Sequence, residues 1–427
     1  MRRWVLLFLV SRLAVMLLSD QSRLFLFVDE ELYRGTIGRL LDIAPHISLF
    51  SLRTDDFNSG AMVFGWLASR SFRVFGPTVF ALKLIPVLWF TAALWFWQDL
   101  AERFAGRRTA VIFSALFVFS PPSFTAYSLT AMGFHSDTVA LTAATLWLFF
   151  KQTRSEAAGL ARAAALGSLA GFSLWFSYHY ALTLAALALY WLWRERRMPS
   201  GRRTLLIAAG FLAGFWPWLA LNLLGGGQGW VVHGIPVWSL FRPRGQNFVF
   251  TLWATSFGGE NWPAPLKRAA DAGFTLAYAA ILTCGLIAAR RRGRLPGGPL
   301  GLVALLYLVL FAAAAQACAL QEWRYFAPAY PFVLFFVAAS LDGFGRAGAP
   351  AAAALTALSI FFNSFLLSPS HSGEALTSRG YTWRFPLGAV CFEASSCARY
   401  RDAVAPILPP GERRELEEGV AEQLKAL

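Results

Sequence analysis

Long apolar segments, separated by short clusters of Lys and Arg, run through almost the whole chain. About 20 apolar residues suffice for a helix to cross the hydrocarbon core of a bilayer, and a helix satisfies its own backbone hydrogen bonds there. The predicted spans cover residues 4–19, 78–98, 109–130, 134–151, 163–193 as two segments hinged near 177–180, 204–223, a segment ending at Arg290, 299–317, 327–342 and 350–367. This pattern predicts an all-α polytopic membrane protein with a bundle of about eleven transmembrane helices.

Composition agrees with a membrane protein, because 57% of the residues are hydrophobic and only 15% are charged, whereas soluble domains average about 25% charged residues. The net charge of +14 does not indicate a nucleic-acid partner, since Lys and Arg gather between the apolar runs. Such clusters mark cytoplasmic loops and orient the chain with its N-terminus in the cytoplasm. No P-loop motif is present, so neither ATP hydrolysis nor a nucleotide cofactor is indicated.

The first residues, MRRWVLLFLVSRLAVMLLS, resemble a signal peptide in their basic start and apolar middle. They lack a small-x-small cleavage site, and Arg12 interrupts the apolar run. We therefore interpret them as a retained first span.

The orientation divides the chain into two parts. Residues 1–367 form the predicted transmembrane domain, with a long first outer loop at 20–77 and another at 225–271, and residues 368–427 form a small extracytoplasmic tail with a helix-like charged end. Within the first loop, the stretch up to Gly76 carries Arg70 and Arg73 among aromatic residues and predicts an amphipathic helix on the membrane surface. The Ala-rich run Ala347 to Ala357 suits close helix packing.

The cysteines divide in the same way. Cys284 and Cys318 lie in apolar runs and are interpreted as core thiols. Cys391 and Cys397 lie in the tail, where they predict a local disulfide in an oxidising compartment; a zinc-ligand pair is the alternative, although no Cys-x-x-Cys motif supports it.

Ionisable residues gather at the predicted outer face. The stretch FVDEELYRG follows the first span and contributes Asp29, Glu30 and Glu31. Charged groups at membrane depth are costly, so they usually pair or line a wet cavity. Spans and loops on the same side add Lys83, His135, Asp137, His179, Arg242, Arg244, Arg324 and Tyr325.

Several of these residues also have simpler interpretations. Glu31 is expected to point to water, and His179 to be a hydrogen-bonded core histidine. His135 and Asp137 form either a substrate or metal pair or an ordinary polar helix cap. Arg324 either meets substrate, pairs with Glu322 or anchors the chain at the membrane interface. The remaining loop cations are expected to be solvated: Arg242 and Arg244.

A lipid-phosphate-linked sugar suits this inventory. Its phosphate leaves as a stable anion, so the reaction needs a base for the acceptor and cations for the departing phosphate. A glycoside hydrolase would instead need two carboxylates at matched separation.

Four stretches together resemble the GT-C glycosyltransferases, specifically the group of protein O-mannosyltransferases, aminoarabinose transferases and Rgt-like bacterial enzymes (glycosyltransferase family 39-like). They are VDEELYRG, similar to that group's Asp-Glu-x-x-Tyr motif, GAMVFGWLASRSFRVFGPTVFALKLIP, with Lys83 in place of the usual Arg, GSLAGFSLWFSYHYALTLAALALYWL, and RYFAPAYPFVLFFVAASL. The resemblance implies a GT-C-like bundle in a bacterial inner membrane that serves the cell envelope.

The resemblance also implies roles for individual residues. Asp29 would be the catalytic base and Glu30 its acidic neighbour, while Lys83 and Arg324 would meet the lipid phosphate. The predicted substrate- and lipid-phosphate-binding set is completed by Tyr33, Tyr325, His135 and Asp137. The expected partners are a polyprenyl-phosphate-sugar donor, membrane lipids, and a lipid, glycan or protein acceptor. Whether a divalent cation takes part is left open.

Two other classes of protein share some of these features. A transporter or flippase would show inverted repeats and broken helices that meet at mid-membrane, and no such symmetry is evident in the sequence. A non-catalytic subunit that binds a lipid-linked sugar would keep its partners without Asp29.

Overall fold

The computed structural model describes residues 2–18, 28–46, 60–133, 137–151, 156–194, 201–225, 231–232, 235–236, 264–292, 295–313, 326–367, 398, 401–402 and 404–426. The α-helices are α1 (Arg2–Leu18), α2 (Val28–Ile43), α3 (Gly60–Phe75), α4 (Val79–Ala105), α5 (Arg107–Val118), α6 (Pro122–Tyr127), α7 (Thr138–Phe150), α8 (Glu156–Phe176), α9 (Ala181–Arg194), α10 (Gly201–Gly225), α12 (Ala264–Arg292), α13 (Gly298–Ala313), α15 (Tyr330–Gly343), α16 (Gly348–Leu367) and α18 (Pro410–Ala426). Short 3-10 turns are η3 (Tyr178–Tyr180), η7 (Gly345–Ala347) and η9 (Ala405–Ile407), and the strands β1 (Val231–Val232) and β2 (Ile235–Pro236) pair antiparallel.

Each predicted span coincides with a helix of the described chain, so the predicted all-α polytopic fold class is confirmed. The matching helices are α1, α4, α5 with α6, α7, α8, α9, α10, α12, α13, α15 and α16. The diproline at Pro121 and Pro122 separates α5 from α6, and the predicted hinge is η3. Within the described residues, four helices are long and apolar enough to cross a membrane: Val79–Ala105, Glu156–Phe176, Gly201–Leu223 and Gly345–Ser364.

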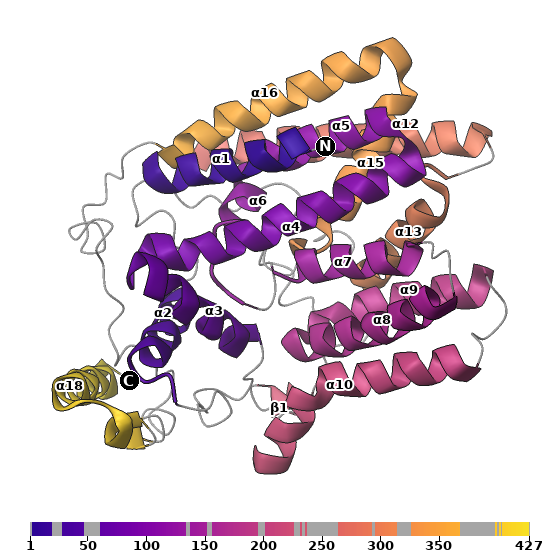
Figure 1. The fold of residues 1–427 in the computed structure, drawn as a ribbon. Coiled ribbons are helices and arrows are strands. Elements are labelled where there is room, and N and C mark those ends of the chain that lie inside the picture. The colour runs from indigo at the N-terminus through magenta and orange to yellow at the C-terminus, as the bar shows by residue number, and fades with distance from the viewer. Residues whose placement is uncertain are drawn as a thin grey trace.

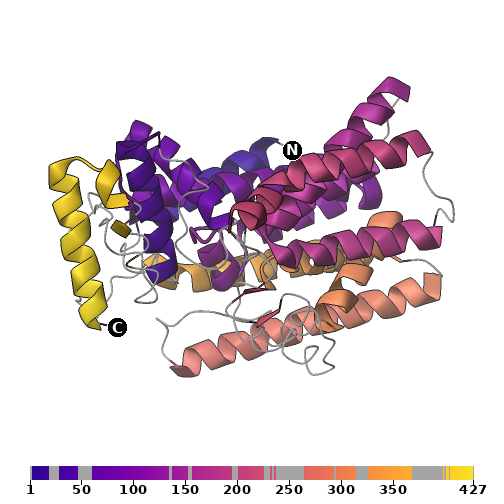
Figure 2. The same ribbon diagram turned by 90° about the horizontal axis from the view of Figure 1, so that it is seen from below.

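The two helices of the predicted first outer loop lie at one end of the bundle. Figure 1 shows α2 and α3 there together with the C-terminal helix α18, while the long helices run alongside one another. Figure 2 shows the same arrangement from below. The amphipathic character predicted for α3 is confirmed, since Phe64, Ala68 and Phe72 are buried whereas Arg70 and Arg73 are exposed.

An aromatic core holds the central helices together. The Trp97 ring on α4 lies 5.0 Å from the Phe332 ring on α15 and 5.7 Å from the Phe113 ring on α5. Tyr307 on α13 stacks on Phe332 at 4.3 Å. Offset and edge-on ring pairs of this kind add stability beyond the area that they bury, so these contacts fix four helices around one centre.

Glycines allow α8 and α10 to pack with their backbones in contact. A Cβ atom at Gly171 would lie 2.1 Å from the Phe211 carbonyl oxygen, and one at Gly214 would lie 2.0 Å from the Ser168 carbonyl oxygen. Small residues spaced four apart are the usual means of close helix approach in membranes. The glycines are therefore what joins α10 to the bundle.

The prediction for Cys284 was wrong, because the side chain is exposed on the outside of the bundle. Its helix, α12, turns Phe274, Tyr278 and Gly285 inward. In a membrane helix both the packed face and the lipid-facing face are apolar, so an apolar run alone does not show which face is buried. The other cysteines lie outside the described residues: Cys318, Cys391 and Cys397.

Candidate active site

The candidate acids begin helix α2. Its backbone is helical from Val28, so Asp29 and Glu30 occupy the first turn, although their side chains lie outside the described part of the chain. Three residues after Glu30, Tyr33 is fully buried in an apolar cluster with Ile37. The first turn of α2 is thus followed at once by residues that anchor the helix in the protein.

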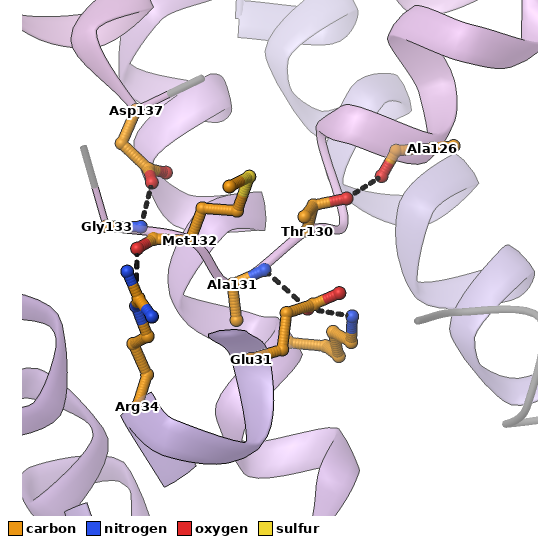
Figure 3. A network of polar contacts seen from close by, with 9 residues as sticks. Glu31, Arg34, Ala126, Thr130, Ala131, Met132, Gly133 and Asp137 are labelled. Carbon is orange, nitrogen blue, oxygen red and sulfur yellow. Dashed lines mark hydrogen bonds and ion pairs between the residues drawn. The ribbon is translucent and has the colours of Figure 1, made fainter. Parts of the chain in front are cut away.

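Glu31 is completely buried, so the expectation that it points to water was wrong. One of its oxygens, Oε2, accepts from the Lys83 Nζ on α4 and from the Ala131 backbone N–H at 2.7 Å (Figure 3). Both side chains of the Glu31–Lys83 pair have 0% exposure. A charge is costly to bury without partners, so Glu31 stays buried only while it keeps these two contacts. The pair therefore ties α2 to α4 and to the segment 130–133.

Arg34 makes a second link to the same segment. Its Nε donates to the Met132 carbonyl oxygen at 2.7 Å, and its guanidinium lies 5.2 Å from the centre of the Tyr33 ring. Arg34 is only 2% exposed. Glu31 and Arg34 are three residues apart and therefore lie on one face of the helix. That face holds the backbone of residues 131 and 132 (Figure 3).

Asp137 closes the other side of this network. Its Oδ2 accepts from the Gly133 backbone N–H at 2.8 Å, whereas Oδ1 has no hydrogen-bond partner among the described residues. Asp137 precedes α7 but its side chain does not cap that helix, so the expected polar cap is not formed by this carboxylate.

Two glycines bring α3 against the segment 130–133. Gly133 has a φ of +79°, and a Cβ atom there would lie 2.7 Å from the Gly60 carbonyl oxygen. A Cβ atom at Gly60 would lie 1.6 Å from the Gly133 carbonyl oxygen. Only glycine tolerates both the backbone conformation and the close approach. Neither position was predicted from the sequence, where the local signal is only a glycine at the start of α3 and another shortly before α7.

The C-terminal helix packs on the outer side of α2. Arg39 donates to both carboxylate oxygens of Glu415, at 2.5 and 2.9 Å, and to Glu412 at 2.9 Å. Apolar contacts accompany these ion pairs, from Ile37 and Leu40 on α2 and from Leu416 and Val420 on α18. The predicted tail and the predicted first outer loop therefore lie together.

Other predicted site residues are only partly accounted for. His135, Arg324 and Tyr325 lie outside the described residues, as do Arg242 and Arg244. His179 is 3% exposed, with its ring 5.6 Å from that of Phe311, which agrees with a core histidine. Across the described part of the chain, no group of three or more His, Cys, Asp or Glu side chains could hold a metal ion.

Comparison with solved structures connects this arrangement to a known architecture. ArnT from Cupriavidus metallidurans, bound to undecaprenyl phosphate, superposes with a TM-score of 0.58 over 98% of this chain and 74% of that chain, at 18% identity. The fold is that of the GT-C glycosyltransferases. The apo state of the same ArnT matches with a TM-score of 0.54 at 17% identity, over 80% of this chain and 60% of that chain.

At this level of identity the GT-C likeness concerns the fold alone. No family model matches the sequence, and no curated protein matches it either. The chain is thus an integral multi-pass membrane protein with a GT-C bundle.

Proposed function

We propose that the chain is a membrane glycosyltransferase that moves a sugar from a polyprenyl-phosphate donor to an acceptor hydroxyl on the extracytoplasmic side. The observation that carries the proposal is the position of Asp29, in the first turn of α2 and directly before the buried network of Glu31, Lys83, Arg34 and Asp137. Buried contacts fix the backbone of this helix end, and a fixed backbone supports the positioning that a catalytic base needs. The ArnT structure with undecaprenyl phosphate supports the class of donor.

In the proposed reaction Asp29 accepts the proton of the acceptor hydroxyl as that oxygen attacks the anomeric carbon. The new bond from oxygen to the anomeric carbon forms while the bond from that carbon to the phosphate oxygen breaks. The phosphate leaves as an anion on its lipid, so no general acid is required. Attack from the face opposite the leaving group inverts the anomeric centre. Glu30, beside Asp29, would act as its acidic neighbour.

Cations are needed beside the leaving phosphate. Arg324 and Tyr325 are proposed for that role, with His135 and Tyr33 on the substrate side. Lys83 is proposed to serve the lipid-phosphate region through its charge, while it also holds Glu31. Asp137, whose Oδ1 has no partner among the described residues, is proposed to receive a hydrogen bond from substrate.

The test compares Asp29→Asn with Asp42→Asn. Asp42 lies on the same helix and its carboxylate pairs with Arg73 at 3.3 Å on the surface, so it controls for the loss of a carboxylate from α2. Purified variants are given a panel of undecaprenyl-phosphate-linked hexoses and pentoses with membrane extract as acceptor. We expect Asp29→Asn to lower transfer by about 10²–10⁴-fold, the usual contribution of a general base, and Asp42→Asn to retain it. Undiminished transfer by Asp29→Asn would remove this residue from the mechanism.

Lipid capture separates the proposal from its rivals. A non-catalytic subunit would bind the lipid-linked sugars without turnover in the wild type as well. A flippase would move the lipid between leaflets of a vesicle and leave the sugar attached. Mass spectrometry of the recovered lipids shows whether the sugar has left its carrier, which distinguishes the transferase from both rivals; leaflet exposure of the lipid in vesicles then distinguishes the two rivals.

A further inference from the structure

An open apolar groove lies between α1, α5 and α16. It has a volume of about 410 Å³, within the range of about 300–1,000 Å³ that is typical of ligand sites. Trp4 on α1 and Ile112 and Ala115 on α5 form one side, and Ala353, Thr356 and Ala357 on α16 form the other. Figure 1 shows the three helices along one edge of the bundle.

The groove exists because α16 presents small side chains to its neighbours. The Ala-rich run was expected to give close packing, but Ala353 and Ala357 are exposed and line the hollow instead. Val111 on α5 and Ile360 on α16 also line the groove, and they are 42% and 48% exposed. The groove is therefore open to the surroundings of the bundle, and in a membrane an apolar chain fills it.

Cationic side chains surround one end of the groove. Arg2 and Arg3 begin α1 next to Trp4, Arg107 begins α5, and Arg346 lies in η7 three residues before Ala349, which also lines the groove. All four are exposed, and none forms an ion pair with another described residue. Their charge is thus available to a ligand at the end of the groove.

A fifth arginine holds this end together. Arg108 lies 3.2 Å from the Asp342 carboxylate and donates to the Gly345 carbonyl oxygen at 2.5 Å. Thr109 donates to the same carboxylate at 2.8 Å. These contacts join the start of α5 to the turn before α16, so Arg107 and Arg346 are kept near each other.

We propose that this groove binds an anionic diacyl phospholipid, with one acyl chain along the alanines of α16 and the phosphate among Arg2, Arg107 and Arg346. Basic pockets between transmembrane helices are suited to anionic head groups. The site lies at the basic end of the bundle, away from α2 and its acids. It is therefore separate from the proposed donor site and does not depend on the proposed reaction.

The test uses the full chain in a nonionic detergent with equal amounts of phosphatidylglycerol and phosphatidylcholine, and native mass spectrometry counts the lipids retained. We expect one phosphatidylglycerol per chain, with at least about tenfold preference over phosphatidylcholine. The variant Arg2→Gln/Arg107→Gln/Arg346→Gln should lower that preference to about one. Ala353→Phe, which fills the groove from an exposed position, should reduce retention of the lipid itself.

The matched control is Arg290→Gln/Arg291→Gln, which removes two exposed arginines from the end of α12 and should leave the preference unchanged. Equal loss in this control would show general attraction to a basic surface and overturn the proposal. Equal retention of the two phospholipids by the wild type, or no effect of Ala353→Phe, would overturn it as well. Stronger retention of added undecaprenyl phosphate, with the same dependence on the three arginines, would assign the groove to an isoprenoid lipid instead.

Discussion

Glu31 on α2 and Lys83 on α4 form an ion pair without any exposed side-chain surface, although 52 positions separate them in the chain. Burying two charges costs several kcal/mol for each ion, and good geometry with further hydrogen bonds is needed to offset that cost. The Ala131 N–H provides one such bond. The pair therefore couples the order of α2 to that of α4 and of the segment 130–133.

Removing either partner alone should destabilise the protein more than removing both. Glu31→Gln leaves the Lys83 cation buried without its counterion, and we expect a loss of about 3–5 kcal/mol in the free energy of unfolding. Lys83→Met should cost a similar amount, whereas Glu31→Gln/Lys83→Met should recover part of it. Thermal unfolding in detergent measures all three variants. Additive losses in the double variant would contradict a coupled pair.

Asp137 should be needed for the conformation of the segment 130–133. Its Oδ2 accepts from the Gly133 backbone N–H at 2.8 Å, and the side chain is fully buried. Asp137→Ala leaves this N–H without its acceptor, and we expect a loss of about 1–3 kcal/mol in the free energy of unfolding. Asp137→Asn keeps an oxygen that can accept the same hydrogen bond, so we expect a smaller loss.

Melting temperatures of the wild type and of the two variants test this prediction, with Asp42→Asn as the control for a surface carboxylate. Equal stability of Asp137→Ala and the wild type would show that this hydrogen bond does not hold the segment.

Arg39 should hold the C-terminal helix on α2 through charge. Arg39→Glu places a third carboxylate beside Glu412 and Glu415, which are 31% and 39% exposed. Partly exposed pairs contribute modestly, so we expect a loss of about 1 kcal/mol and about fivefold faster proteolysis near α18. The charge swap Arg39→Glu/Glu412→Arg/Glu415→Arg should restore protection. Unchanged cleavage in Arg39→Glu would show that the apolar contacts alone hold the helix.

Glycine at position 171 should be required for the attachment of α10. Gly171→Leu forces a side chain into the Phe211 backbone, and we expect a loss of about 1–3 kcal/mol, as for other overpacked sites. Gly273→Leu on α12 is the matched control, because nothing lies within 4 Å of a Cβ atom there. Disulfide trapping between α8 and α10 would report the separation of the helices. Equal stability of the two variants would argue against the close packing.

The course of the helices could be predicted from the sequence because its signals are local. An apolar run long enough to span the membrane, followed by arginines, is contained within a single window. Prolines at 121 and 122 mark the end of α5 in the same way. These features depend on the solvent properties of the bilayer and not on distant parts of the chain.

The interior of the candidate site could not be predicted in this way. Glu31 is buried because it meets Lys83 and the backbone of Ala131, which is 100 positions away in the chain. Three adjacent acids in a sequence do not show which one turns inward. Gly60 and Gly133 depend on each other's backbone, so neither is informative by itself. Cys284 shows the same limit from the outside, since lipid and protein core accept the same apolar side chains.

The contact between α18 and α2 also has a consequence for biogenesis. The apolar side chains of Ile37 and Leu40 are covered by Leu416 and Val420, which are translated after every predicted span. A chain released from the ribosome after residue 367 would contain every predicted span and still lack the cover of its first outer helix. Such a product would expose an apolar surface on α2 to proteases and chaperones. Protein quality control would then distinguish a chain that carries α18 from one that lacks it.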